Sequence, residues 1–361
     1  MSFKYKWFKP FETVSKPQQI DPKLLSKKTM GKYSIDLEKK LKKILKVKYV
    51  VLTNSGTSAL MMANLALGIN KNTKIITTNL SWIATINPSI ILGSKIFLVD
   101  TEPYSQRVNF KTLNKMIKKV KPNIVILSHL SGAAHIDREF VNLKKKYAFK
   151  VIEDAAQSFL HKYKKNKFFG TLFEVGCFSL SITKIVNMVY GGFCTTNSKT
   201  MANKLVAIRN NGVNALPENS RDELPSQRGL NFKPSDLHSF FGLKNLNKHK
   251  TIVKKVSDIS KYYFNNLRNS KFSFLDNYLN NPRIYPSIIV DNKKKFNNFC
   301  KNNNLEIHFG VRCLSESRLL SKNSNLFPHS SLISKRLVRL PCGPGYNLKN
   351  IKKIVQILNK Y

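Results

Sequence analysis

The sequence predicts an α/β fold with a mostly parallel central sheet. Between residue 34 and about residue 210, short segments rich in β-branched residues alternate with stretches whose apolar residues recur at helical spacing. Such an alternation is typical of right-handed βαβ units, in which successive strands lie parallel. After about residue 250 the elements become shorter, which indicates a smaller α+β domain at the C-terminal end.

The length and composition agree with a large soluble protein. The chain has 361 residues, and single domains usually hold about 100–200 residues, so we expect one large and one smaller domain. Hydrophobic residues make up 42% of the chain, which excludes a mostly disordered protein. We expect an N-terminal arm over residues 1–33, a large domain over 34–250 and a small domain over 251–361.

The expected elements follow one another in chain order. The first helix has its apolar residues at helical spacing from Leu37 to Leu45, with Ser34 as the expected N-cap. A strand over 49–53 then leads through a polar turn into a helical stretch over 59–67. Further strands are expected at residues 74–78, 95–100, 123–128, 149–154, 175–180, 192–196 and 285–291. Helices are expected over residues 110–120, from about 137, near 201–210, after 291 and over 351–358.

The charge of the chain is strongly positive. Lys and Arg number 62 against 20 Asp and Glu, a formal net charge of +42, which favours anionic partners. Lysine is abundant everywhere, however, and no single basic block stands apart, so a general bias of composition is the favoured interpretation. A nucleic-acid-binding protein is an alternative, but the sequence has no recognition motif and no aromatic–basic repeat, so we expect no specific nucleic-acid partner.

The cysteines and the uncharged segments indicate a cytoplasmic protein. The five cysteines are odd in number and widely spaced, and none forms a CxxC pair, so neither a disulfide framework nor a metal site is expected. The N-terminus lacks the apolar run of a signal peptide. The two long uncharged stretches, between Lys48 and Lys71 and between Lys74 and Lys95, are interrupted by polar residues, so no membrane span is expected.

The first candidate for chemistry is the polar turn after the strand at 49–53. Ligands of an open parallel sheet bind at the carboxyl ends of its strands. In this turn Gly56 allows close approach of an anion to the backbone, and the free amides of a helix N-terminus favour negative charge. Thr57 and Ser58 add hydroxyl donors. An ordinary helix start is the alternative, because Ser and Thr are frequent N-caps.

The second candidate is the acidic end of the strand at 149–154. Asp154 is followed by two alanines, which leave room for a flat ligand, and its carboxylate could keep a ring nitrogen protonated. A helix N-cap or a surface acid is the alternative for Asp154.

Two further residues follow strands in the same way. Lys184 follows an apolar strand and precedes a Gly-Gly pair, and a lysine amine can form a Schiff base with an aldehyde. Trp82, one of two tryptophans, follows the strand at 74–78 and could lie flat on an aromatic cofactor, although a lone aromatic is more often part of a core. A phosphate site, an aromatic lid, an acid for a ring nitrogen and an aldehyde-binding lysine are together the parts needed to hold pyridoxal phosphate.

Five segments together resemble the sugar aminotransferases of the DegT/StrS group. They are SGTSAL (55–60), TNLSWIATINPSI (78–90), VIEDAAQS (151–158), GCFSLSITK…GG (176–192) and GLNFKPSDLHSFFGL (229–243). The resemblance covers about residues 30 to 250 and continues more faintly through RLPCGPGYN (339–347). It implies the fold-type I architecture of pyridoxal phosphate enzymes, a three-layer sandwich with a mostly parallel sheet and a smaller C-terminal α+β domain.

The resemblance also implies a role for each matching residue. Lys184 would bind the cofactor covalently and act as the catalytic base, with Asp154 on the pyridine nitrogen, Gln157 on the ring hydroxyl, and Trp82 stacked on the ring. The phosphate would be held by Gly56, Thr57, Ser58 and Ser179, and by Asn231 of the neighbouring subunit in a homodimer. His129 would lie near the ring and the substrate.

The activity implied is ping-pong transamination in a cytoplasmic homodimer. An amino acid, expected to be glutamate, donates its amino group to the cofactor, which passes it to a nucleotide-linked keto-sugar in the synthesis of surface polysaccharide or another glycoconjugate. A related enzyme that deoxygenates the sugar is disfavoured, because such members replace the lysine with histidine. A catalytically altered or binding homologue is the remaining alternative, since the chain departs from the family pattern at Ser131, at Ser181-Ile182 and at Met188-Val189-Tyr190.

Overall fold

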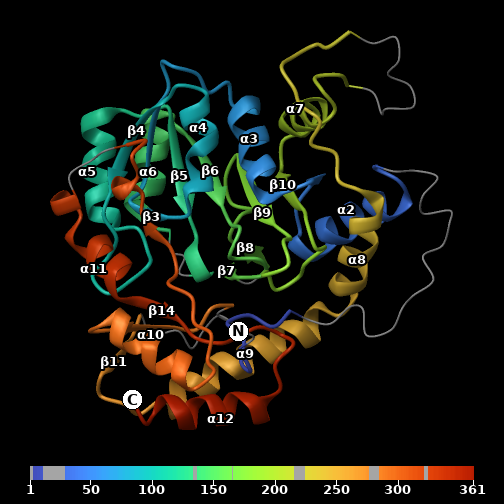
Figure 1. The fold of residues 1–361 in the computed structure, drawn as a ribbon. Coiled ribbons are helices and arrows are strands. Elements are labelled where there is room, and N and C mark those ends of the chain that lie inside the picture. Colours follow the sequence, from blue (N-terminus) through green and yellow to red (C-terminus); the bar gives the residue numbers. More distant parts are fainter. Residues whose placement is uncertain are drawn as a thin grey trace.

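A computed structural model describes residues 3–10, 29–132, 136–164, 166–214, 224–275, 284–320 and 324–361. The centre of the molecule is a seven-stranded sheet (Figure 1). In spatial order its strands are β1 (Tyr49–Thr53), β10 (Gly192–Thr196), β9 (Val175–Ser179), β6 (Lys150–Asp154), β5 (Ile124–Ser128), β2 (Lys74–Thr78) and β4 (Lys95–Val99). Each of them begins and ends within one residue of the bounds expected from the sequence.

The direction of the strands places their carboxyl ends at one edge. The five strands from β9 to β4 are parallel, whereas β10 is antiparallel to both of its neighbours. Two antiparallel steps restore the original direction, so β1 runs the same way as β9. The fold class predicted from the sequence, an α/β protein with a mostly parallel sheet, is therefore confirmed, although β1 pairs with no parallel neighbour.

Helices cover both faces of this sheet and make three layers (Figure 1). One face carries α3 (Gly56–Ala66), α4 (Asn87–Ile91) and α7 (Lys199–Arg209), and the other carries α2 (Lys32–Leu45), α5 (Phe110–Val120) and α6 (Arg138–Tyr147). Adjacent residues of one strand show this division, because Ile75 packs in the core with α3 and Ile76 packs in the core with α5.

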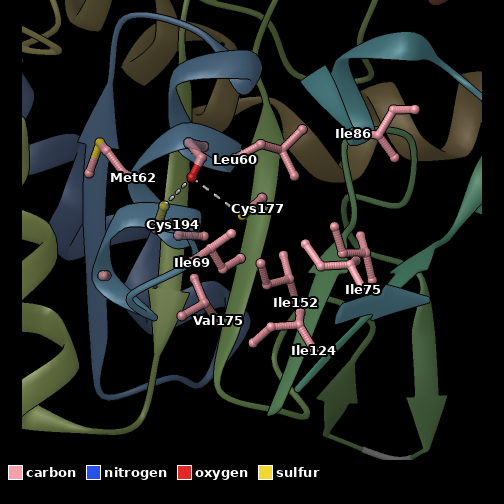
Figure 2. Packing of buried hydrophobic residues seen from close by; sticks show 14 of the residues in the cluster. Leu60, Met62, Ile69, Ile75, Ile86, Ile124, Ile152, Val175, Cys177 and Cys194 are labelled. Carbon is pink, nitrogen blue, oxygen red and sulfur yellow. Dashed lines mark hydrogen bonds between the residues drawn. The ribbon is translucent and has the colours of Figure 1, made fainter. Parts of the chain in front are cut away.

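The core under α3 is built almost entirely from aliphatic side chains. Figure 2 shows Leu60 of α3 above Val175, Ile152 and Ile124, which come from three adjacent parallel strands. This continuous apolar run across the sheet is typical of strands that are buried on both faces. All five cysteines of the chain are free and buried, and burial raises the pKa of the Cys177 thiol.

The start of α2 differs from the sequence expectation. The helix begins at Lys32 with Gly31 as its N-cap, so Ser34 lies inside the first turn and the expected cap at Ser34 was wrong. The cap comes from a distant part of the chain instead. Asp236, the first residue of α8 (Asp236–Asn247), accepts hydrogen bonds from the Ser34 amide and from the Ser34 hydroxyl, both at 2.7 Å. A tertiary contact therefore supplies the acceptor that the local sequence lacks.

The substitution Asp236→Ala is expected to lower the free energy of unfolding by about 2 kcal/mol, because it leaves buried donors of α2 without an acceptor. Urea unfolding followed by circular dichroism measures the change. Asp258→Ala removes an exposed carboxylate that pairs with Lys254, and this control is expected to change the unfolding free energy by less than about 0.5 kcal/mol. Equal effects of the two substitutions would contradict the capping role of Asp236.

A second, three-stranded antiparallel sheet lies in the C-terminal part of the chain. Its strands are β11 (Phe272–Phe274), β12 (Ser287–Val290) and β14 (Leu337–Arg339). Around it lie α9 (His249–Asn266), α10 (Lys293–Asn302), α11 (Pro328–Arg336) and α12 (Leu348–Leu358) (Figure 1). The short elements are β3 (Leu80–Ser81), η1 (Ile83–Thr85), η2 (Leu130–Gly132), β7 (Lys162–Lys164), β8 (Lys167–Phe168), β13 (Arg312–Cys313), η3 (Leu314–Glu316) and η4 (Ser324–Leu326).

Backbone pairing joins the C-terminal part to the rest of the molecule at several places. β13 pairs with β3, and the N-terminal segment 3–10 pairs with C-terminal residues through bridges from Tyr5 to Leu305 and from Phe8 to Cys342. The division into 1–33, 34–250 and 251–361 stays a prediction, and residues 11–28 of the expected arm lie outside the described residues. No helix in the described ranges is long and apolar enough to cross a membrane.

Candidate active site

A cavity of about 390 Å³ opens at the carboxyl-end edge of the central sheet. It lies where β5, β6 and β9 end and where α3 begins, which is the position expected for a ligand of a parallel sheet. Of the residues proposed from the sequence, eight line it: Gly56, Thr57, Trp82, His129, Asp154, Gln157, Ser179 and Lys184. Ser58 and Asn231 are not among the lining residues.

One end of the cavity is suited to an anion. Ser55 caps α3 by accepting a hydrogen bond from the Ser58 amide at 3.0 Å, so the helix offers no acceptor to the amides of Gly56 and Thr57. Gly56 packs directly against β9, since a Cβ at this position would lie 2.8 Å from the Ser179 Cβ. The free amides at the N-terminus of α3, where the helix dipole is positive, therefore lie next to the Ser179 hydroxyl, and together they can bind an anion.

The hydroxyls near this end are arranged differently from the sequence expectation. The Ser58 Oγ donates to Asn54 Oδ1 at 2.6 Å and also lies 2.8 Å from the Ser55 Oγ, which occupies it away from the cavity. Ser181, which the sequence analysis named only as a departure from the family pattern, lines the cavity with its hydroxyl 3.3 Å from that of Ser179. Ser181 is thus an additional candidate for holding an anion, and it was missed.

Asp154 supplies a buried negative charge in the cavity. Only 7% of this residue is exposed, and its carboxylate accepts hydrogen bonds from the Thr85 hydroxyl at 2.6 Å and from the Ala156 amide at 3.2 Å. Both donors are neutral, and in the part of the chain that the structure describes no cationic side chain forms an ion pair with Asp154. A buried carboxylate without a counter-ion is well suited to a cationic ligand group.

The carboxylate of the neighbouring Glu153 forms hydrogen bonds with other groups than Asp154 does. Its carboxylate accepts from the backbone amides of Gly170 and Leu172, both at 2.7 Å, and from Phe173 at 3.1 Å. It also lies 3.1 Å from His129 Nε2. Because an ionised carboxylate only accepts, the hydrogen of this pair sits on Nε2 of His129. Glu153 thereby fixes the orientation of the His129 ring at the cavity wall.

The loop that carries Lys184 is held at several points. The Lys184 amide closes a turn on the Ser181 carbonyl at 3.0 Å, and the Tyr285 hydroxyl donates to the Thr183 carbonyl at 2.8 Å. The Lys184 ammonium nitrogen lies 5.8 Å from the centre of the Tyr285 ring. Beyond it, Val189 has a φ of +66°, so the segment that departs from the family pattern adopts a tight left-handed turn.

Gln157 and Trp82 complete the surroundings of Lys184 and Asp154. The Gln157 Oε1 accepts from the Ser131 amide at 3.0 Å and from Arg339 Nη2 at 3.2 Å, which leaves the side-chain amide nitrogen to donate to a ligand. Trp82 is 58% exposed although it is a large aromatic residue, so its ring is available at the mouth of the cavity and is not part of a core.

Asn231 lies outside the cavity of its own chain. It is exposed, its backbone bridges to Asn210, and its carbonyl accepts a hydrogen bond from the Asn54 side chain at 3.5 Å. Within one subunit the residue therefore has no place on the anion site.

Several lining residues were not predicted from the sequence. They come mainly from segments far from the strand motifs: Trp7, Ser128, Thr183, Tyr190, Tyr285, His308 and Arg339. Thr183 and Tyr190 lie in the segment 176–192 and Arg339 lies in the run 339–347, which were noted for their resemblance, but none of the three was proposed as a site residue.

The donor set of the cavity suits pyridoxal phosphate and not a metal ion. Free amides and hydroxyls match a phosphate, a buried carboxylate matches a protonated pyridine, and an amine matches an aldehyde. Among the described residues no cluster of three or more His, Cys, Asp and Glu could hold a metal. The fold and the site together define an enzyme of the pyridoxal phosphate class.

The chain belongs to the DegT/DnrJ/EryC1/StrS aminotransferase family, whose family model matches residues 20–359. The predicted family is thus confirmed, and with it the activity of an aminotransferase.

Individual relatives are distant but match over most of the chain. A UDP-4-amino-4,6-dideoxy-N-acetyl-beta-L-altrosamine transaminase of Campylobacter jejuni subsp. jejuni serotype O:23/36 (strain 81-176) is 25% identical and covers 91% of this chain and 90% of its own. A GDP-perosamine synthase of Vibrio cholerae is 25% identical over 92% of this chain and 91% of its own. The solved E. coli GDP-4-keto-6-deoxy-D-mannose-3-dehydratase with bound hydrated PLP is 16% identical, with a TM-score of 0.85 over 99% of this chain and all of that chain.

Proposed function

We propose that this protein transfers an amino group from an amino acid, with glutamate as the expected donor, to a nucleotide-linked keto-sugar for surface polysaccharide or glycoconjugate synthesis. The observation that carries the proposal is that the Lys184 amine, the Asp154 carboxylate and the N-terminus of α3 line one cavity. The substrate class is supported by the names of the two relatives above, both of which make amino sugars attached to a nucleotide.

Each group of the cavity has a role in binding the cofactor. The amides of Gly56 and Thr57 and the hydroxyls of Thr57, Ser179 and Ser181 would hold the phosphate, and Gln157 would donate to the ring hydroxyl. Trp82 would cover one face of the ring, and His129, which Glu153 orients at 3.1 Å, would lie near the ring and the substrate. We assign no phosphate contact to Ser58 within its own subunit, because its hydroxyl is occupied by Asn54 and Ser55.

Lys184 moves the proton of the reaction. When bound, pyridoxal phosphate supplies an aldehyde carbon for exchange between amines and a protonated ring that withdraws electrons. The Lys184 Nζ would act as the base that takes the proton from the donor's α-carbon and as the acid that returns it during transfer of the amino group. The turn that Ser181 closes and the hydroxyl of Tyr285 keep this lysine in place during both proton transfers.

Asp154 controls the charge of the ring. Its carboxylate is buried, and the hydroxyl of Thr85 and the amide of Ala156 hold it without neutralising it. The remaining negative charge keeps a facing pyridine nitrogen protonated, because an opposite charge nearby favours the ionised form. Asp154 thereby maintains the electron withdrawal on which the proton transfer at Lys184 depends.

A half-reaction measured by absorption tests the proposal. Purified protein loaded with pyridoxal phosphate is expected to show the visible band of a lysine-bound cofactor, which L-glutamate removes and 2-oxoglutarate restores. Glutarate, which has no amino group, is the matched control and leaves the band unchanged. Tight cofactor binding without bleaching across a panel of amino acids would contradict the proposal and favour the alternative of a non-catalytic homologue.

We further propose a cytoplasmic homodimer in which each subunit completes the site of the other. Asn231 is exposed and absent from its own cavity, and the adjacent Leu230 is an exposed hydrophobic residue, as are Trp82, Ile182 and Tyr190. Trp82 and Tyr190 also line the cavity, and exposed apolar residues of this kind favour an interface. The proposed location is supported by the five free cysteines, which suit a reducing compartment.

Subunit hybrids test the role of Asn231. Asn231→Asp places a negative charge where a phosphate of the partner is expected, so Asn231→Asp homodimers and Lys184→Ala homodimers should both be nearly inactive. Hybrids co-expressed from the two variants, and purified through two different tags, are expected to regain up to about half of the wild-type activity, because one of the two sites is then intact. Hybrids that stay inactive would place Asn231 in its own subunit's site or outside the site.

A further inference from the structure

Arg339, the last residue of β14, is a buried cation at the wall of the cavity. Only 4% of the residue is exposed. Its Nη2 donates to Gln157 Oε1 at 3.2 Å, and its guanidinium carbon lies 4.3 Å from the centre of the Tyr285 ring. Its Nε is buried and has no hydrogen-bond partner.

The charge of Arg339 has no counter-ion in the described residues. Arg209 is buried to a similar degree, with 2% exposed, and its Nη1 lies 2.9 Å from Glu38 Oε1. Among the described residues, the groups in contact with Arg339 carry no negative charge: they are the Gln157 amide oxygen, the Tyr285 ring and His308. Burial and the nearby Arg339 and Lys293 lower the pKa of His308 to about 4, so this histidine is neutral at neutral pH. A buried guanidinium without an anion is costly unless a ligand supplies one.

The shape and the position of the guanidinium select the ligand. Its planar fork matches a carboxylate in two parallel hydrogen bonds, and the unpartnered Nε is one of the donors that such a pair uses. Arg339 and the reacting lysine line the same cavity, and both approach Tyr285: the Lys184 Nζ lies 5.8 Å and the Arg339 Cζ 4.3 Å from the centre of that ring. The phosphate candidates Gly56 and Ser179 have no contact with it among the described interactions. The ligand group is therefore one carried close to the reacting carbon.

We propose that Arg339 binds a carboxylate of the substrate, held close to the Lys184 amine. The inference rests on the proposed transamination and deepens it. Two sources of a carboxylate fit this place: the α-carboxylate of the amino donor, which is attached to the reacting carbon, and a carboxylate carried by the keto-sugar. The carboxylate itself is unchanged by the transfer of the amino group, so Arg339 would contact substrate and product alike. Arg339 therefore determines specificity and takes no part in proton transfer.

The test measures binding and the two half-reactions separately in Arg339→Gln. Glutarate, a dicarboxylate that cannot react, is titrated calorimetrically into the holoenzyme, with the uncharged glutaramide as the matched probe. We expect the affinity for glutarate to fall by about tenfold to a hundredfold and the affinity for glutaramide to stay unchanged. Arg336→Gln is the control, because it removes the same charge from a partly exposed site that pairs with Asp291.

The half-reactions distinguish the two sources. If the donor supplies the carboxylate, Arg339→Gln raises the half-saturating L-glutamate concentration at least about tenfold while the limiting bleaching rate changes little. If the sugar supplies it, the defect instead appears in the return half-reaction, with a keto-sugar bearing a C6 carboxylate and not with its C6-methyl counterpart. Either result supports the carboxylate site. Equal losses for charged and uncharged probes, or no loss for either, would overturn it.

Two further results keep this test separate from the test of the overall function. If the wild type never bleaches with any donor but binds glutarate more tightly than Arg339→Gln does, the proposed transamination fails and the carboxylate site stands. If Arg339→Gln does not fold, Arg339→Lys replaces it: a lysine keeps the charge and loses the fork, so glutarate affinity should fall severalfold. Unchanged glutarate affinity in Arg339→Lys would overturn the proposal in that case.

Discussion

Lys184→Ala is expected to abolish the visible band of the lysine-bound cofactor and to lower the transamination rate by at least about a thousandfold. The variant loses both the amine that exchanges with the donor and the base that moves the α-proton, and general acid–base catalysis alone is worth about 10²–10⁴-fold. The phosphate and ring contacts remain, so pyridoxal phosphate should still bind. Absorption spectra and single-turnover kinetics with L-glutamate measure the two effects.

The choice of control matters in a chain with 62 lysines and arginines. Lys199→Ala, at the exposed first residue of α7, removes the same charge far from the cavity and is expected to leave spectrum and rate unchanged. Retention of the visible band in Lys184→Ala would place the covalent bond on another lysine. The assignment of Lys184 as the residue that binds the cofactor would then be wrong.

Asp154→Asn is expected to have the second largest effect, a loss of at least about a hundredfold in the rate of the half-reaction. The amide can still accept the 2.6 Å hydrogen bond from Thr85, so the local structure should be retained. What disappears is the negative charge that keeps the ring nitrogen protonated, and with it the electron withdrawal that makes the α-proton acidic. Stopped-flow bleaching by L-glutamate measures the rate, and the visible band shows that the cofactor is still bound.

A cofactor analogue with a fixed positive charge is expected to restore part of the activity of Asp154→Asn. Reconstitution with a cofactor analogue whose ring nitrogen is permanently methylated, and therefore always cationic, should recover part of the rate in Asp154→Asn. Asp258→Asn, in the exposed pair with Lys254, is the control for loss of one carboxylate. A rate within a factor of about three of the wild type in Asp154→Asn would mean that this carboxylate does not control the ring.

Local sequence patterns predicted the central sheet well because its strands are short apolar runs bounded by polar turns. They could not predict that β1 pairs with the antiparallel β10, since pairing depends on contacts between residues more than 140 positions apart, such as Val51 and Cys194. The prediction of the N-cap of α2 was wrong for the same reason. Ser34 has the right chemistry for an N-cap, but Asp236 occupies that role from 202 residues away.

The candidate site shows the same limit. Residues that follow a strand directly, such as Asp154 and Lys184, could be proposed because the carboxyl ends of parallel strands share one edge. Arg339 and His308 reach the cavity from the C-terminal sheet and its surroundings, and no periodicity signals such an approach. The orientation of single hydroxyls could not be predicted either. Ser58 bonds to Asn54, whereas Ser181 lies beside Ser179 in the cavity, and only these contacts show which hydroxyl can face a ligand.

Borohydride reduction followed by peptide mass spectrometry shows which lysine binds the cofactor. Hydride converts the carbon–nitrogen double bond between lysine and cofactor into a stable secondary amine, which marks the bonded residue permanently. We expect one modified peptide, with the pyridoxyl group on Lys184, and no modification when L-glutamate has first converted the cofactor. A pyridoxyl group on a different lysine, or spread over the many exposed ones, would contradict this expectation.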